Sequence, residues 1–321
     1  MIFCFCSANK LTYTGGCEIG PRPIDLHLKA LRNMGARVQD VQRGFIYCEA
    51  DKLEGCDIQL DYPSVGATEN IMLASVFAEG ITCIHNAAKE PEIFDLQSYL
   101  RGIGVDITGA GTSTVTIKGS RKRLKSIKHE VMPDRIVAGT YMVAAGITGG
   151  SIVLNNVIPE HMSSIIYNLR DAGCRISINR NKISINGPDR PSAIDTIRTL
   201  PYPGFPTDMQ AQMVAMLTIA RGTSIVIETV FENRYKHVEE LLRMGANIKL
   251  EGRIAVIKEV PRLFGANVTA KDLRGGAALV LAGLSAEGET IVNGLKHIDR
   301  GYENLEGKLA QLGAIIKRIE S

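Results

Sequence analysis

A glycine-rich loop near the start of the chain contains a cysteine that could do chemistry. Residues 15–23 include three glycines and two prolines, a composition typical of a loop. Positive charge near a thiol favours the reactive thiolate, and Arg22 follows Cys17 in the same loop. The residue pattern leaves two interpretations open, a working cysteine and an ordinary loop thiol.

A carboxylate stands where a helix is predicted to begin. Asp208 follows Phe205, Pro206 and Thr207 and precedes an apolar helical pattern, so it could cap that helix. It could also accept a proton, or a sugar hydroxyl, if it faces a cleft. The two roles are compatible.

Arginines recur at the junctions between predicted elements. Most surface arginines only solvate a fold, but several beside helix N-termini would form a site for phosphate and carboxylate groups. The candidates are Arg22, Arg135, Arg234, Arg274 and Arg300.

The elements that must position these residues form a repeat. A glycine flanked by an apolar and a small residue recurs at intervals of 69, 69, 72 and 68 residues, at Gly35, Gly104, Gly173, Gly245 and Gly313. An amphipathic pattern precedes each glycine, which predicts a helix closed by a left-handed glycine cap. A second, small-residue-rich helix opens each unit near residues 64, 134, 208 and 272, after a Ser, Thr or Asp cap.

The predicted unit is helix, strand, helix, strand, strand, and the fold class is α/β (α+β) with repeated βαβαββ units. Four complete units are expected after a half unit that runs from Arg22 to about Leu60. Because a half unit cannot bury its own faces, we expect that about one and a half units, roughly a hundred residues, are missing in front.

Composition excludes several classes of protein. The 321 residues suffice for about two domains. A net charge of +3, 5% aromatic residues and no Trp argue against binding to nucleic acid. No apolar run reaches the length that spans a bilayer, so no membrane partner is expected. Seven cysteines without paired spacing predict a reduced, cytoplasmic protein with no metal site.

Eight segments resemble the UDP-N-acetylglucosamine enolpyruvyl transferases, the family that begins peptidoglycan synthesis. The resemblance runs along almost the whole chain from Gly15 to Ile319, and together the segments are very specific. They are residues 15–27, 63–68, 86–92, 132–136, 205–212, 228–234, 271–274 and 297–303.

The resemblance implies a two-domain inside-out α/β barrel with helices inside, sheets outside and the active site between the domains. The domains would be residues 1–131, an incomplete first domain with the cysteine loop, and residues 132–321, a second domain of three units. The family transfers the enolpyruvyl group of phosphoenolpyruvate to the 3-hydroxyl of UDP-N-acetylglucosamine, without a cofactor, and releases phosphate.

The resemblance also assigns roles to residues of this chain. Cys17 would donate the proton to the methylene carbon and react with fosfomycin, Asp208 would accept the hydroxyl proton, and Arg300 would join them as a catalytic residue. The implied substrate-binding residues are Arg22, Pro23, Ile24, Asp25, Leu26, Tyr62, Pro63, Ser64, Val65, Asp208, Val230, Arg234, Arg274 and Arg300. Many family members have a lysine at the position of Tyr62.

The family's N-terminal strand, and the lysine and asparagine that follow it, have no counterpart in the sequence. We therefore expect this chain by itself to be weak or inactive. Two alternatives stay open: a non-catalytic remnant that binds the UDP-sugar, and a shikimate-pathway enolpyruvyl transferase, a family that lacks the cysteine loop. The sequence does not predict an oligomeric state.

Overall fold

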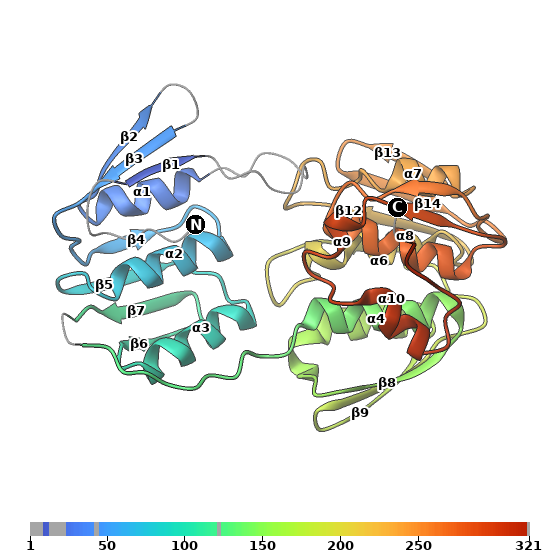
Figure 1. Cartoon of the computed structure of the whole chain (residues 1–321), viewed down its shortest axis with the longest axis horizontal. Helices are drawn as coiled ribbons and strands as arrows, with labels where there is room; N and C mark the ends of the chain where they lie inside the picture. The colour runs from blue at the N-terminus through green and yellow to red at the C-terminus, as the bar shows by residue number, and fades with distance from the viewer. Residues whose placement is uncertain (1–8, 13–23, 42–44, 121–122, 320–321) are drawn as a thin grey trace. The chain divides into compact units, whose positions relative to one another are not determined.

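The structure is a computed structural model that describes residues 9–12, 24–41, 45–120 and 123–319 (Figure 1). Its compact units divide at Met132 and Pro133. The domain boundary predicted from the sequence, between residues 131 and 132, lies one residue earlier. Each unit is described by itself below.

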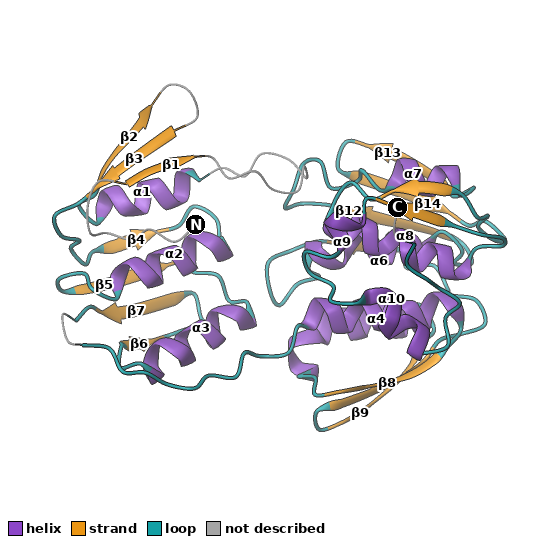
Figure 2. Cartoon of the chain, viewed as in Figure 1, coloured by secondary structure: helices purple, strands orange, loops and turns teal. Residues whose placement is uncertain are grey.

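The first unit contains two sheets with helices packed beside them (Figure 2). The sheets have the strand orders β1-β3-β2 and β4-β5-β7-β6, in which β4 and β5 are parallel and the other pairs antiparallel. In chain order the elements are β1 (Asn9–Thr12), α1 (Asp25–Asn33), β2 (Arg37–Val41), β3 (Phe45–Glu49), β4 (Asp57–Gln59), α2 (Val65–Ser75), β5 (Ile81–His85), α3 (Pro91–Gly102), β6 (Asp106–Thr108) and β7 (Thr114–Lys118).

The second unit contains three sheets, of strand orders β8-β10-β9, β11-β12-β14-β13 and β15-β16. Its elements up to the middle sheet are α4 (Arg135–Thr148), β8 (Ser151–Asn155), η1 (Pro159–Met162), α5 (Ser163–Asp171), β9 (Arg175–Asn179), β10 (Lys182–Asn186), β11 (Thr196–Arg198), η2 (Thr207–Met209), α6 (Gln210–Leu217), β12 (Thr223–Ile227), α7 (Val238–Arg243), β13 (Asn247–Glu251) and β14 (Ile254–Lys258). The remaining elements are β15 (Asn267–Thr269), α8 (Leu273–Ser285), β16 (Ile291–Asn293), α9 (Leu295–Ile298) and α10 (Leu305–Gln311).

The strand orders confirm the predicted repeat. The run β4-α2-β5-α3-β6-β7 of the first unit and the run β11-α6-β12-α7-β13-β14 of the second have the same order of elements and the same pairing, with one parallel pair followed by an antiparallel hairpin. The fold class of repeated βαβαββ units is therefore correct.

The last predicted unit is not complete within the described residues. After α10, residues 314–319 form no strand, although Ala314 and Ile316 pack on the core and Ile315 is fully exposed. That alternation is typical of a strand, but a strand also needs a neighbour to pair its backbone groups. The prediction of four complete units was wrong at this end for that reason.

The predicted glycine caps are confirmed. The φ angles are +93°, +105°, +96°, +88° and +98°, in the order Gly35, Gly104, Gly173, Gly245 and Gly313. A side chain is strained at such angles, so glycine lets the chain leave each helix toward the following strand.

Three buried helices, α4, α6 and α8, contribute much of the core of the second unit, and inward-facing strand residues complete it. Helix α6 has eight residues and all of them are buried, while α4 and α8 are buried over most of their length. Small residues allow this close approach: a Cβ added at Gly139 of α4 would lie 2.9 Å from the sulfur of Met209. Among the described residues, no helix is both long and apolar enough to cross a membrane.

Three of the predicted N-caps are confirmed. Ser64 caps α2, Asp134 caps α4 and Asp272 caps α8, each through a side-chain oxygen that accepts backbone N–H groups. These bonds satisfy donors that the first turn of a helix leaves without partners.

Substitution of Asp134 by alanine should destabilise the chain by about 1 kcal/mol, because the amides of Ile136 and Val137 lose their acceptor. A lower urea midpoint would measure the loss. Asp134→Asn is the matched control, since asparagine caps equally well and should leave the midpoint almost unchanged. An equal loss in both variants would contradict the capping role.

Candidate functional site

Asp208 lies in η2 at the start of α6, and two arginines contact its carboxylate. Arg234 donates to Oδ1 at 2.5 Å and Arg274 donates to Oδ2 at 3.4 Å. The carboxylate makes no capping bond: the residue before η2 is Pro206, and no side chain caps that turn. The N-cap interpretation of Asp208 was therefore wrong, because the turn places its carboxylate toward the arginines.

Both guanidinium groups are buried and supported by aromatic rings. The side chain of Arg234 is 4% exposed and that of Arg274 is 11% exposed. Arg234 lies over the ring of Phe231 at 5.5 Å, and Arg274 lies over the ring of Tyr302 at 5.2 Å. The guanidinium group is suited to such stacking because it is planar and weakly hydrated.

The two arginines have hydrogen-bond capacity left over. Within the described part of the chain, Nε of Arg234 and both Nε and Nη1 of Arg274 are buried without an acceptor. Buried polar groups are normally paired, and these donors belong to charged groups. The arrangement suits an anionic ligand, because a carboxylate or phosphate would supply the acceptors.

The charges around Asp208 keep it ionised. Burial alone would raise the pKa of its carboxyl, but the positive charges of Arg234 and Arg274 outweigh this effect and hold the pKa below its usual value. Burial lowers the pKa of the neighbouring His237 to about 4, and the charge of Arg234 adds to this shift. At neutral pH the Asp208 carboxylate thus faces two cations, and the nearby His237 imidazole is neutral although the charge of Asp272 opposes the lowering of its pKa.

Glu228 holds the segments around Asp208 together, a role that was not predicted from the sequence. The residue is 1% exposed, and its carboxylate accepts four hydrogen bonds: from the hydroxyls of Thr199 and Thr207 and from the amides of Val230 and Phe231. Glu228 lies within a segment matched to the family, residues 228–234, which was the only signal in the sequence.

A buried polar network supports the other side of η2. Gln212 Nε2 donates to the carbonyl oxygen of Asp208 and lies within hydrogen-bond distance of the Thr140 and Tyr302 hydroxyls. These two hydroxyls are also 2.9 Å apart. Since the ring of Tyr302 lies under Arg274, the network links α4, α6 and the support of that arginine. No pattern in the sequence indicated this network.

The predicted residues of the first unit lie at the starts of two neighbouring helices. Ile24, Asp25 and Leu26 begin α1, and Tyr62, Pro63, Ser64 and Val65 lead into α2. His27 of α1 hydrogen-bonds Asn70 of α2, and Lys29 forms an ion pair with Asp61 at 2.9 Å. Two helix N-termini side by side provide backbone N–H groups and positive dipole ends for an anion.

The remaining predicted residues are placed as follows. Val230 is half-buried beside Glu228, and Arg300 is exposed just after α9. Cys17, Arg22 and Pro23 lie outside the described residues. In the second unit the structure thus brings Asp208, Arg234 and Arg274 together.

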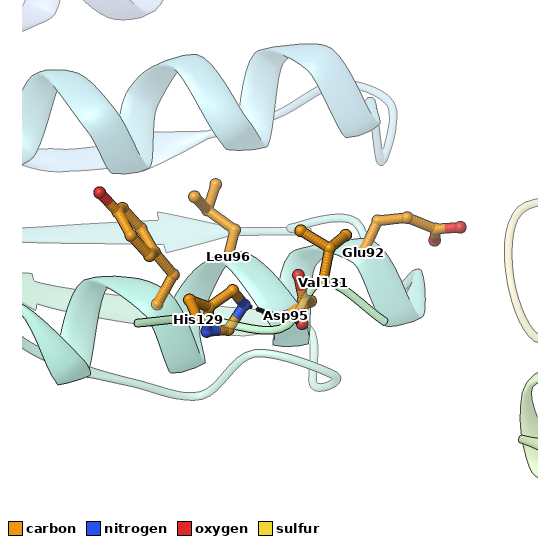
Figure 3. A pocket seen from close by; sticks show the side chains of 6 residues that line it. Glu92, Asp95, Leu96, His129 and Val131 are labelled. Carbon is orange, nitrogen blue, oxygen red and sulfur yellow. Dashed lines mark hydrogen bonds and ion pairs between the residues drawn. The ribbon is translucent and has the colours of Figure 1, made fainter. Parts of the chain in front are cut away.

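A separate pocket of roughly 320 Å³ belongs to the first unit (Figure 3). His129 faces Asp95 at 3.2 Å, and Leu96 and Val131 line the pocket with Glu92 and Tyr99. None of these residues was predicted to be functional, and the Asp208 cluster belongs to the other unit. Among the described residues, no group of three or more His, Cys, Asp or Glu side chains could hold a metal ion.

Comparison with known proteins defines the class. The family model described as EPSP synthase (3-phosphoshikimate 1-carboxyvinyltransferase) matches residues 1–309. The enolpyruvyl transferase NikO from Streptomyces tendae superposes with a TM-score of 0.85 at 22% identity, over 97% of this chain and 74% of that one. The EPSP synthase from Acinetobacter baumannii has a TM-score of 0.70 at 20% identity, over 97% and 75%. The fold is that of the enolpyruvyl transferases.

Closer relatives specify the family. UDP-N-acetylglucosamine 1-carboxyvinyltransferase 2 of Caldanaerobacter subterraneus subsp. tengcongensis is 55% identical over 309 residues, which are 96% of this chain and 74% of the relative. UDP-N-acetylglucosamine 1-carboxyvinyltransferase 1 of Carboxydothermus hydrogenoformans is 55% identical over 305 residues, or 95% and 72%. The chain belongs to the UDP-N-acetylglucosamine 1-carboxyvinyltransferase family.

Proposed function

We propose that the chain transfers the enolpyruvyl group of phosphoenolpyruvate to the 3-hydroxyl of UDP-N-acetylglucosamine and releases phosphate. This would be the first committed step of peptidoglycan synthesis, and it would take place in the cytoplasm. The observation that carries the proposal is an ionised Asp208 between two buried arginines with unused donors. An acceptor for a hydroxyl proton and a binding site for an anionic co-substrate thus adjoin each other.

The family resemblance and this geometry suggest the following chemistry. The 3-hydroxyl oxygen bonds to C2 of phosphoenolpyruvate while its proton passes to Asp208, and the double-bond electrons take a proton at C3 from the Cys17 thiol. Arg234 and Arg274, together with Arg22 and Arg300, would hold the phosphate and carboxylate. The Cys17 thiolate then takes a proton back from C3, and the electrons of that C–H bond restore the double bond as phosphate leaves.

The nucleotide-sugar would bind along the first unit. The diphosphate suits the adjacent N-termini of α1 and α2, which begin near Ile24 and Val65. Tyr62 is 41% exposed there and offers a hydroxyl instead of the lysine common in the family. We therefore assign it no charge contact with the diphosphate.

Phosphate release by the purified chain tests the proposal. Release should require both phosphoenolpyruvate and UDP-N-acetylglucosamine, and shikimate 3-phosphate should not replace the sugar nucleotide. Heat on titration with UDP-N-acetylglucosamine but no phosphate would favour the binding remnant. A rate equal to that of the Caldanaerobacter enzyme would contradict the weak activity expected from the sequence.

A further inference from the structure

We infer that Glu228 is a positioning residue that sets the geometry of both Asp208 and Arg234. The inference rests on the proposed function of the Asp208 cluster. Glu228 touches neither Asp208 nor the arginine donors that would bind substrate, so its effect must pass through the residues that it holds.

The first path leads to Asp208. The Thr207 hydroxyl donates to Oε2 of Glu228 at 2.9 Å, and Thr207 is the residue before Asp208 in η2. Because the short turn has no side-chain cap of its own, this bond fixes its first residue. A loss of the bond would let the turn shift, and Asp208 would shift with it.

The second path leads to Arg234. The amides of Val230 and Phe231 donate to Oε1 of Glu228 at 2.8 and 3.1 Å, which fixes the turn after β12. The ring of Phe231 is the surface on which the Arg234 guanidinium lies. The two partners of the 2.5 Å pair are thus both placed by one carboxylate.

The third contact anchors this carboxylate to the sheet. Thr199 follows β11 and donates to Oε1 at 3.0 Å, so its hydroxyl oxygen is available to accept from the amide of Thr229, 2.8 Å away. Thr229 in turn donates its hydroxyl proton to the Thr199 carbonyl oxygen. The hydrogen bonds between Thr199 and Thr229 therefore fix the end of the parallel β11–β12 pair, and the Thr199 hydroxyl holds the Glu228 carboxylate there.

Two variants of Glu228 separate positioning from folding. Glu228→Ala removes all four acceptor contacts and should lower kcat for phosphate release by about 100-fold, the effect of misplacing a catalytic group by about 1 Å. Glu228→Gln keeps one oxygen, which can still accept hydrogen bonds from the three groups that donate to Oε1. Its amide N–H can donate to the hydroxyl oxygen of Thr207. It should recover kcat to within about tenfold of wild type. Glu259→Ala is the control, because Glu259 accepts from the Gly222 amide at the opposite end of β12.

The rate per folded site decides the outcome. The number of UDP-N-acetylglucosamine sites per chain, measured by calorimetry, gives the folded fraction of each variant. A purely structural role would reduce that number and leave kcat per site unchanged, which would overturn the inference. A kcat of Glu228→Ala within threefold of wild type would also overturn it.

Crystal structures test the same inference without an assay. In Glu228→Ala the Asp208 carboxylate and Arg234 guanidinium should move apart, and in Glu228→Gln they should keep their pairing. An unmoved pair in Glu228→Ala would overturn the positioning role. If instead the wild-type chain releases no phosphate, the proposed function fails, and the movement of the pair still decides the structural inference.

Discussion

Replacement of Asp208 by asparagine is expected to lower kcat for phosphate release by about 10²- to 10⁴-fold, the usual contribution of a proton acceptor. Asparagine keeps the shape of the side chain but cannot accept the proton of the 3-hydroxyl. The carboxylate of the wild type is available for this purpose at neutral pH because Arg234 and Arg274 hold its pKa below the usual range.

The same measurement separates this role from a loss of binding. Affinity for UDP-N-acetylglucosamine, measured by calorimetry, should change far less than kcat, since the hydroxyl can still hydrogen-bond the amide oxygen. Asp195→Asn is a matched control, because Asp195 is an exposed carboxylate before β11 of the same unit. If Asp208→Asn kept more than a tenth of the wild-type kcat, Asp208 would not be the proton acceptor.

The proximity of Asp208 and Arg274 could be anticipated from the sequence because the repeat is regular. Asp208 and Arg274 occur at the starts of corresponding helices in successive units, α6 and α8, which pack against each other in the structure. Residues at the starts of two corresponding helices lie close together when those helices pack side by side. The family resemblance supplied the roles, which the repeat alone could not.

Glu228 could not be predicted because its function depends on residues far from it in the sequence. Its partners Thr199 and Thr207 precede it by 29 and 21 residues; the pairing of β11 with β12 brings Thr199 to its carboxylate, and the turn η2 brings Thr207. The error about Asp208 had a local cause. A carboxylate before an apolar helix is usually its cap, but η2 begins after Pro206 and places Asp208 inside the turn.

Arg234→Leu should weaken phosphoenolpyruvate binding and move the acid limb of the kcat/KM profile to higher pH. In the wild type, burial raises the pKa of Asp208, while the charges of Arg234 and Arg274 lower it further than burial raises it. Removal of one charge leaves burial opposed by Arg274 alone, so the pKa must rise. The side chain of Asp208 is 40% exposed, and the loss of stability should therefore be smaller than the 3–5 kcal/mol of a fully buried pair.

The sign of the pH effect follows from the protonation states. A carboxyl whose pKa is lowered by folding stabilises the protein above its unfolded pKa, and this contribution disappears as the pH falls through the folded pKa. In Arg234→Leu the activity should begin to fall at a higher pH than in the wild type, whereas the stabilisation from Asp208 should be smaller and should disappear completely at a higher pH. A profile that kept the wild-type acid limb would show that Arg234 does not control the ionisation of Asp208.

Arg234→Lys divides the two roles of the arginine. Lysine keeps the positive charge but loses the planar fork that lies on Phe231 and offers a spare Nε–H. The acid limb should then stay closer to that of the wild type than in Arg234→Leu, whereas KM for phosphoenolpyruvate should rise in both variants. Arg262→Leu is the control, since Arg262 is an exposed arginine of the same unit that pairs with Glu287. A shifted limb with an unchanged KM would mean that Arg234 tunes Asp208 and does not bind the anionic substrate.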